Sequence, residues 1–278
     1  MSAVTRRQTV AWLRSIYGGP PDPDDPAEAY HEASKVTPSQ IGRQLQGAVR
    51  LAADRELRLS SMRAVKRQGV AGIPLPAPAP LDGRLDDVLG RRRSHRAFDP
   101  DPIAVDALSA LLHAGYGVTG AVGGEEGEPE LCLRSVPSGG ALYPLELYAA
   151  VQRVGGLEPG LYHFDPPRKC LEGVRTGISA DELAGLSTYP EIASSCAALV
   201  LIAAIFGRTR FKYGLRGYRF ALLEAGHVAQ NVLLAATALG LAAVPLGAFY
   251  DRRMDAFLGL DGVNESSLYA IALGGEPT

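Results

Sequence analysis

The most apolar run of the sequence, CAALVLIAAIF at Cys196–Phe206, constrains the fold more strongly than any other segment. It is only about half as long as a helix that crosses a bilayer, so it predicts a strand buried inside a sheet. Shortly after it, Tyr218–Leu239 is apolar nearly all round and predicts a long helix that is buried on most sides. A buried strand followed by a buried helix indicates a mixed α/β domain.

From Leu81 onward, helical and strand-like patterns alternate, which agrees with an α+β (mixed α/β) fold. We expect helices at Val105–Gly117, Ser179–Leu186 and Arg252–Leu258, and strands at Leu145–Val151, Gly160–Phe164, Leu241–Ala248 and Ser267–Leu273. Before Leu81, Gln40–Gln68 predicts one or two amphipathic helices whose many arginines face solvent, and the alternating prolines of Ile73–Pro80 predict a stiff connector. We therefore expect residues 1–80 to form a helical N-terminal extension with a Pro-rich connector, and residues 81–278 to form the main domain.

The composition narrows the class of protein. Of the 278 residues, 46% are apolar and 21% are charged, as in ordinary soluble domains. The net charge of −2 at pH 7 gives no overall attraction to nucleic acid or to an anionic membrane. The three cysteines form no CxxC or Cys/His cluster, which argues against a metal site and a disulfide framework. Because the first residues also lack the long apolar core of a signal peptide, we expect a cytoplasmic protein with no metal, nucleic-acid or membrane partner.

A cation-rich segment, GRRRSHRAFDPDPI at Gly90–Ile103, follows a short helical pattern. It places four arginines within six positions around Ser94. Guanidinium groups and a hydroxyl suit the oxygens of a phosphate, because they donate paired hydrogen bonds. The alternative is a solvated basic turn without a ligand.

A second cation-rich segment, RTRFKYGLRGYRF at Arg208–Phe220, contains five cations, interleaved aromatic residues and no acid. Since it lies between a buried strand and a buried helix, we expect a loop at the end of a strand, where α/β proteins often build binding sites. Lys212 and Tyr213 can act there as a proton acceptor and donor pair if burial lowers the pKa of the lysine. The mixture of aromatic and basic residues can also stack the bases of a single-stranded nucleic acid, and this alternative stays open.

Two further patterns point to a site. PSGGALYPLELYAAV at Pro137–Val151 has two adjacent glycines before a strand, and a turn without Cβ atoms lets the backbone approach a flat or charged ligand. On the predicted long helix, Glu224, His227 and Asn231 share one face. Buried polar groups need partners, so this stripe faces a ligand, trapped water or, as the favoured alternative, a hydrogen-bond network inside the protein or at a subunit interface.

Together, these segments resemble the nitroreductase-like flavoproteins, and within them the SagB-type azoline oxidases. RRRSHRAF is similar to the family's N-terminal flavin signature, and PSGGALYPLELY to the glycine loop of this branch. KYGLRGYRFALLEAGHVAQNVLLAATALGL, VPLGAFYDRRMDAFLGLDG and LYAIALGGEP follow in the expected order. The resemblance covers the chain from about Leu81 to its end. It implies the nitroreductase-like fold, a central and mostly antiparallel sheet flanked by helices, in a domain-entwined homodimer.

The resemblance also implies a cofactor, FMN, with two sites at the subunit interface that are each built from both chains. By analogy, the phosphate and ribityl side of FMN is held by Arg92, Arg93, Ser94 and Arg96. The flavin ring lies along Pro137, Ser138, Gly139, Gly140 and Ala141 of the other subunit. Near its reactive centre, the ring has Pro245, Leu246 and Gly247 beside it. Lys212 and Tyr213 correspond to the catalytic pair of related azoline oxidases. The glycine turn would then be flat because a flavin ring lies against it.

The activity implied by the resemblance is FMN-dependent oxidation of thiazoline or oxazoline rings to thiazole or oxazole in a ribosomally synthesised peptide, with the flavin reoxidised by oxygen. The modified precursor peptide would be the substrate, and a cyclodehydratase complex is an expected partner. One alternative is an NAD(P)H-dependent reductase of quinones, nitroaromatics or dehydroamino acids, and another is a non-catalytic peptide-binding subunit. The Lys212–Tyr213 pair favours the oxidase, since typical reductases of the superfamily do not need it.

Overall fold

The computed structural model describes residues 18, 22, 24–39, 41–44, 46–62, 66, 68–123 and 130–277. Residues 1–17, which carry no signal-peptide pattern, lie outside this part of the chain. The chain forms two compact units, residues 1–41 and 42–278. In the first unit, helix α2 (Pro26–Ala33) begins after Asp25, whose carboxylate accepts a hydrogen bond from the Ala27 amide at 2.7 Å and so caps the helix.

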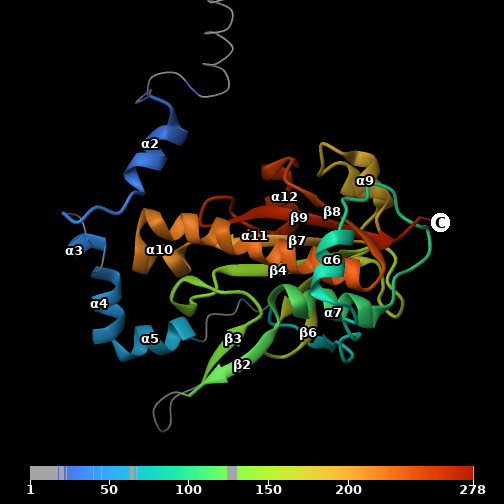
Figure 1. The fold of residues 1–278 in the computed structure, drawn as a ribbon, viewed down its shortest axis with the longest axis horizontal. Coiled ribbons are helices and arrows are strands. Elements are labelled where there is room, and N and C mark those ends of the chain that lie inside the picture. Colours follow the sequence, from blue (N-terminus) through green and yellow to red (C-terminus); the bar gives the residue numbers. More distant parts are fainter. Residues whose placement is uncertain are drawn as a thin grey trace, which may run out of the picture. The chain divides into compact units, whose positions relative to one another are not determined.

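The described residues of the second unit form a seven-stranded antiparallel sheet with the order β1–β6–β5–β4–β7–β9–β8 (Figure 1). The strands are β1 (Gly72–Pro74), β4 (Leu145–Val151), β5 (Gly160–Asp165), β6 (Cys170–Thr176), β7 (Ala198–Ile205), β8 (Leu241–Leu246) and β9 (Glu265–Gly275). Each neighbouring pair is antiparallel; in β4 and β7, for example, Leu145 pairs with Ala204. The predicted mixed fold with an antiparallel sheet is confirmed, and so are five of these strands, β4, β5, β7, β8 and β9.

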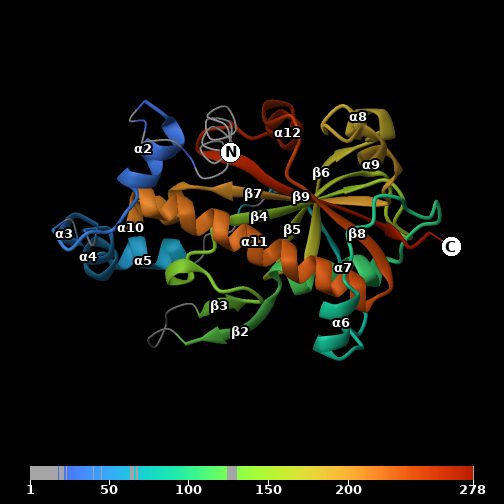
Figure 2. The ribbon, with the colours of Figure 1, turned by 45° about the horizontal axis from the view of Figure 1, so that its top comes forward.

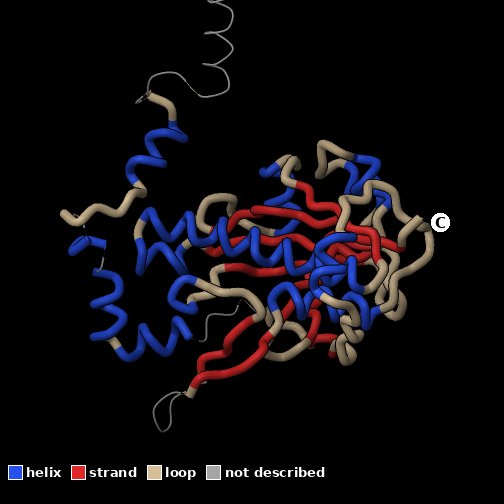
Figure 3. The backbone as a smooth tube through the Cα atoms, viewed as in Figure 1, coloured by secondary structure: helices blue, strands red, loops and turns tan. Residues whose placement is uncertain are grey.

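Helices cover both faces of the sheet (Figure 2, Figure 3). One face carries α7 (Val105–Tyr116) and α11 (Leu215–Ala238), and the other carries α8 (Ala180–Ala184), α9 (Pro190–Ser195) and α12 (Asp251–Leu258). Because side chains alternate along a strand, Leu147 and Ala149 of β4 join the core under α11, while Tyr148 and Ala150 join the core on the opposite face. This burial on both sides explains why the central strand β7 is a continuous apolar run.

The segment Arg208–Phe220 is helical, so the prediction of a loop there is wrong. Gly207–Tyr213 forms helix α10, Gly214 turns the chain with φ +56° and ψ −135°, and α11 follows directly. The Thr209 hydroxyl, which donates to the Gly217 carbonyl at 2.9 Å, joins the two helices. Helices this short depend on such tertiary contacts, which a local sequence pattern does not show. The Lys–Tyr pair therefore lies in the last turn of a helix.

Helix α11 spans the predicted segment, but it is not buried on most sides. Val228 and Val232 lie in the core, whereas Leu222 and Leu223 are 43% and 61% exposed. Leu215 at the start of the helix is also exposed. In the part of the chain that the structure describes, these three leucines thus leave an apolar face of α11 exposed.

Before the sheet, helices α3 (Ile41–Gln44), α4 (Gln46–Ala53) and α5 (Arg55–Met62) confirm the predicted helical character of this segment for its described residues. The Pro-rich connector differs from the prediction at its start, because Ile73 and Pro74 belong to β1 and pair with β6. Proline is tolerated on such an edge strand, which has a hydrogen-bonding neighbour on one side only. The domain boundary after residue 80 stays a prediction. The short helical pattern noted before the Gly90–Ile103 segment corresponds to α6 (Leu85–Arg91). The sequence patterns did not locate β2 (Val118–Val122), β3 (Leu131–Arg134), β6 or α9.

Candidate active site

The glycine turn, Pro137–Ala141, leads into strand β4 and contacts helix α10. Gly140 has a φ of +67°, which residues with a side chain rarely adopt. A Cβ atom at Gly140 would lie 2.5 Å from the hydroxyl oxygen of Tyr213 and 2.6 Å from Nζ of Lys212. Glycine is therefore needed here because the chain's own Lys–Tyr pair lies against the turn.

The Lys–Tyr pair, Lys212 and Tyr213, is half-buried at the end of α10. Nζ of Lys212 lies 5.1 Å from the centroid of the Tyr213 ring, and that ring meets Phe220 of α11 edge-on at 5.0 Å between centroids. An amine and a phenol hydroxyl thus meet at one point of the glycine turn. This arrangement can take a proton from a bound molecule and pass it on. The structure brings together, within one chain, two motifs that the sequence analysis assigned to the site.

A buried carboxylate follows the turn on strand β4. The Glu146 side chain is 3% exposed, and its two oxygens lie 2.6 Å from Nη1 of Arg208 and 2.7 Å from Nε2 of His163. Burial raises the pKa of Glu146, but the hydrogen bond with His163 and the charge of Arg208 outweigh this, and the pKa lies below its ordinary value. Sequence reasoning missed this network, because no local pattern connects a strand residue with a helix more than sixty positions away.

Beneath the glycine turn, α11 presents a second buried carboxyl group, Glu224. Its Oε1 accepts a hydrogen bond from the Tyr116 hydroxyl at 2.7 Å. Burial raises the pKa of Glu224 to about 7, although the hydroxyls of Ser138 and Tyr116 and the charge of Arg134 act in the opposite direction. The Tyr116 hydroxyl in turn accepts from the Leu145 amide at 3.1 Å, so this network joins α7, α11 and the start of β4.

The polar stripe predicted on α11 divides into two parts. Asn231 donates to the carbonyl oxygens of Ala114 and Ser135 at 3.0 and 3.4 Å. The prediction of an internal hydrogen-bond network is therefore confirmed for Glu224 and Asn231. His227 is exposed and takes no part in this internal network, so for His227 the alternative of a subunit interface stays a prediction.

The cation-rich segment Gly90–Ile103, which we call the arginine motif, lies beside the edge strand β8. The His95 amide donates to the Ala243 carbonyl at 3.0 Å and attaches the motif to this strand. Arg96 and Pro245–Gly247 line a pocket of about 180 Å³ there, which we call the arginine pocket. The structure thus brings together two of the predicted groups of cofactor-binding residues.

The arginines of this motif have no acidic partners among the described residues. Arg93 donates to a backbone carbonyl of the motif at 2.8 Å, and Nη1 of Arg92 lies 3.5 Å from the Ser94 hydroxyl. In the part of the chain that the structure describes, Arg91, Arg92, Arg93 and Arg96 form no ion pair with a carboxylate. Four guanidinium groups without a counter-charge suit an anionic ligand such as a phosphate.

The arginine pocket and the glycine turn remain separate within one chain. The described residues that line the pocket include no member of the turn, and neither Lys212 nor Tyr213. The predicted site residues therefore fall into two groups, one at the β8 edge and one at the start of β4. The expectation that the turn belongs to a site of the other subunit stays a prediction.

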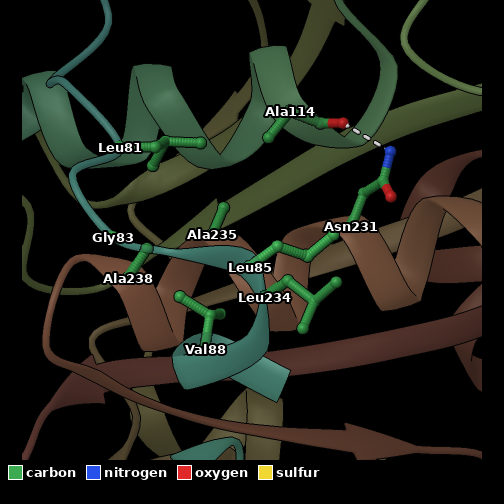
Figure 4. A pocket seen from close by; sticks show the side chains of 9 residues that line it. All are labelled: Leu81, Gly83, Leu85, Val88, Ala114, Asn231, Leu234, Ala235 and Ala238. Carbon is green, nitrogen blue, oxygen red and sulfur yellow. Dashed lines mark hydrogen bonds between the residues drawn. The ribbon is translucent and has the colours of Figure 1, made fainter. Parts of the chain in front are cut away.

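A further pocket, of about 240 Å³, lies between α7, α11 and the segment before α6 (Figure 4). Apolar side chains such as Leu81, Val88 and Leu234 line it. The amide of Asn231, at the edge of this pocket, is already bonded to the Ala114 carbonyl (Figure 4). The lining residues include no cation, so this pocket does not fit a phosphate-bearing cofactor.

The described residues offer neither a metal site nor a membrane-spanning helix. No group of three or more His, Cys, Asp or Glu side chains there can hold a metal ion. No helix among them is both long enough and apolar enough to span a bilayer.

The described residues thus combine a helix-covered antiparallel sheet with a pocket that Arg96 lines at the edge strand β8. The model of the nitroreductase family matches residues 89–275, about two thirds of the chain. This chain therefore belongs to the nitroreductase family.

Individual relatives agree with this assignment. MJ1384 of Methanocaldococcus jannaschii, which is named as a nitroreductase, is 42% identical over 172 residues, covering 62% of this chain and 82% of that protein. The microcin B17-processing protein McbC of Escherichia coli is 36% identical over 120 residues, covering 41% of this chain and 44% of McbC, so this match spans less than half of its length. A chain of the E. coli microcin synthetase McbBCD complex with truncated pro-MccB17 bound shares the fold, with a TM-score of 0.56 and 22% identity over 93% of this chain and 95% of that one.

Proposed function

We propose that this protein oxidises thiazoline or oxazoline rings of a ribosomally synthesised peptide to thiazole or oxazole in the cytoplasm, with FMN as cofactor and oxygen to reoxidise it. The observation that carries the proposal is the close approach of the Lys212 amine and the Tyr213 hydroxyl to Gly140. The similarity to McbC, named as a microcin-processing protein, supports a peptide substrate. The substrate is then a precursor peptide that already carries azolines, and the cyclodehydratase that forms these rings is the proposed partner.

The arginine pocket fits the phosphate end of FMN, because Arg96 lines it and the arginines that precede Arg96 in the sequence pair with no carboxylate among the described residues. Arg92, Arg93, Ser94 and Arg96 would hold the phosphate and the ribityl chain. Pro245–Gly247, which line the same pocket as Arg96, would lie beside the flavin ring. When bound there, FMN supplies the hydride acceptor for the oxidation.

We further propose that a second copy of the chain completes the site. The glycine turn does not line the arginine pocket of its own chain, while Leu215, Leu222 and Leu223 leave an apolar face of α11 exposed. Burial of such a face favours association. In the proposed homodimer, the glycine turn and the Lys–Tyr pair of one chain complete the cofactor site at the arginine pocket of the other.

The chemistry assigns a task to each residue of the Lys–Tyr pair. Azoline oxidation removes a proton from one ring carbon and a hydride from its neighbour, and the product gains aromaticity. Lys212 accepts the proton at Nζ, and the Tyr213 hydroxyl orients the amine. Since aromaticity makes the net reaction favourable, the protein mainly has to hold the ring carbon and the amine in line.

Reduction of quinones, nitroaromatics or dehydroamino acids by NAD(P)H is the second candidate, favoured by the 42% identity to a protein named as a nitroreductase. Mixing experiments without oxygen separate the two. In an oxidase, a thiazoline peptide bleaches the bound flavin quickly and NAD(P)H bleaches it slowly, whereas a reductase shows the opposite order. In a non-catalytic peptide-binding subunit, neither compound would bleach the flavin.

The proposal predicts a yellow protein that releases FMN on denaturation. Replacement of Lys212 by Ala should lower the rate of thiazoline oxidation by roughly 10²- to 10⁴-fold, the usual contribution of a general base, without loss of FMN. Lys35→Ala, at an exposed position just after α2, is the control. The rate is followed by the mass decrease of a synthetic thiazoline peptide. A folded protein without FMN, or unchanged product formation by Lys212→Ala, would overturn the proposal.

A further inference from the structure

Arg208 of helix α10 bonds to the segment that follows the glycine turn. Nη1 of Arg208 lies 2.6 Å from Oε1 of Glu146 and donates to the Tyr143 carbonyl at 3.3 Å. Both acceptors follow the glycine turn directly in the sequence. Arg208 also precedes Lys212 by four residues on α10, so the two side chains lie on the same side of the helix. A contact that holds Arg208 therefore holds the face of α10 that carries the amine.

The acceptor of this contact is itself rigidly held. Glu146 lies on a strand whose seven residues are all buried, and its other oxygen lies 2.7 Å from Nε2 of His163 on the neighbouring strand β5. The backbone amide of Lys66 donates to Oε1 of Glu146 at 3.0 Å. Glu172 stands on the far side of His163, with Oε2 3.5 Å from Nδ1. An arginine bonded to such a buried carboxylate has little freedom, since both partners are largely removed from water.

We propose that Arg208 is a positioning residue: its contacts with Glu146 and Tyr143 hold Lys212 against the glycine turn in the geometry that proton transfer needs. This inference rests on the proposed function, because Arg208 acts only by positioning Lys212, the proposed base. The need for such an anchor follows from the size of α10, which has seven residues and is bounded by Gly207 and Gly214. So short a helix does not hold its own position.

The first test observes the position of Lys212 without using activity. The chain has four lysines, so reductive ¹³C-methylation of the FMN-loaded protein gives four lysine signals by NMR. The signal that disappears in Lys212→Arg belongs to Lys212. Nζ of Lys212 lies close to the Tyr213 ring, so its methyl signal should be displaced from that of the exposed Lys35. Arg208→Gln should move the Lys212 signal toward the Lys35 position. Arg210→Gln, which changes an exposed arginine of the same helix, should leave it in place.

The second test is kinetic. Arg208→Gln should lower kcat for the thiazoline peptide by roughly 10- to 100-fold, the cost of a misplaced catalytic group, while KM and FMN content stay unchanged. Arg208→Lys keeps the charge but not the planar fork, so it should recover only part of the rate and of the NMR displacement. If Arg208→Gln does not fold, the neutral pair Arg208→Gln/Glu146→Gln takes its place, since it leaves no unpaired buried charge.

The outcomes separate this inference from the proposed function. A wild-type NMR position and kcat in Arg208→Gln would overturn the positioning role. Full recovery by Arg208→Lys would also overturn it, because charge alone would then be sufficient. Suppose that Arg208→Gln moves the Lys212 signal toward the Lys35 position while Lys212→Ala keeps full activity. This result would support the anchoring of α10 and refute Lys212 as the base.

Discussion

Glu224 shows how a single buried carboxyl group makes folding depend on pH. Its pKa is raised from the ordinary value of 4.5 to about 7, chiefly by burial, so the folded protein keeps a proton that the unfolded chain has already lost. Because ionisation then favours the unfolded state, the free energy of unfolding falls as the pH rises from 4.5 to 7 and stays lower above that. A pKa difference of this size corresponds to roughly 3 kcal/mol.

Replacement of Glu224 by Gln should remove this dependence. The variant keeps an acceptor for the Tyr116 hydroxyl but cannot ionise, so it should gain stability over the wild type between pH 4.5 and pH 7, by up to roughly 3 kcal/mol at pH 8. Urea unfolding at several pH values measures the difference, and Glu158→Gln, at an exposed position, is the control. A difference that does not change between pH 5 and pH 8 would contradict the assignment.

At the scale of elements, helix α4 is in close contact with the helix that carries the Lys–Tyr pair. A Cβ atom at Gly47 would lie 2.2 Å from the Phe211 carbonyl oxygen and 2.5 Å from the Lys212 Cα atom. Only a residue without a side chain allows the two helices to approach this closely. The segment before the sheet therefore contributes to the support of the candidate active site.

Replacement of Gly47 by Leu should push the end of α10 away from the glycine turn. We expect a loss of about 1–3 kcal/mol in stability from overpacking, and a kcat lower by roughly 10- to 100-fold from displacement of Lys212. Gly42→Leu is a matched control, because a Cβ atom at Gly42 meets nothing within 4 Å. Thermal unfolding and turnover of a thiazoline peptide measure the two effects. Equal behaviour of both variants would mean that α4 does not support α10.

At the scale of the whole molecule, the proposed homodimer would account both for the exposed leucines of α11 and for the separation of the two site groups. The double change Leu222→Asp/Leu223→Asp should place charges in the proposed interface, halve the mass in light scattering and release FMN. Val263→Asp, at a position 74% exposed in a loop, should change neither. A double variant that remains a dimer with bound FMN would show that this face of α11 is not the interface.

The elements whose positions the sequence predicted are those with a local signal. Strand β7 is apolar at every position because helices cover both faces, and α11 has the length of a long apolar segment. Strand β6 was missed because its polar residues, such as the buried Glu172 and the exposed Arg175, dilute the apolar pattern. Helix α10 was read as a loop because its cations and glycines resemble a surface segment, while the contact that stabilises it, Thr209 with Gly217, lies on the next helix.

For the candidate site, the sequence by itself determined the chemical groups: a cationic motif, a glycine turn and a Lys–Tyr pair. These signals are short and contiguous, so they are visible without the fold. Only the tertiary structure decided that Gly140 lies against Lys212 and Tyr213, that Glu146 binds Arg208, and that Glu224 binds Tyr116. The members of each contact lie on different elements, and the packing of helices on the sheet, not the spacing along the chain, determines which side chains meet.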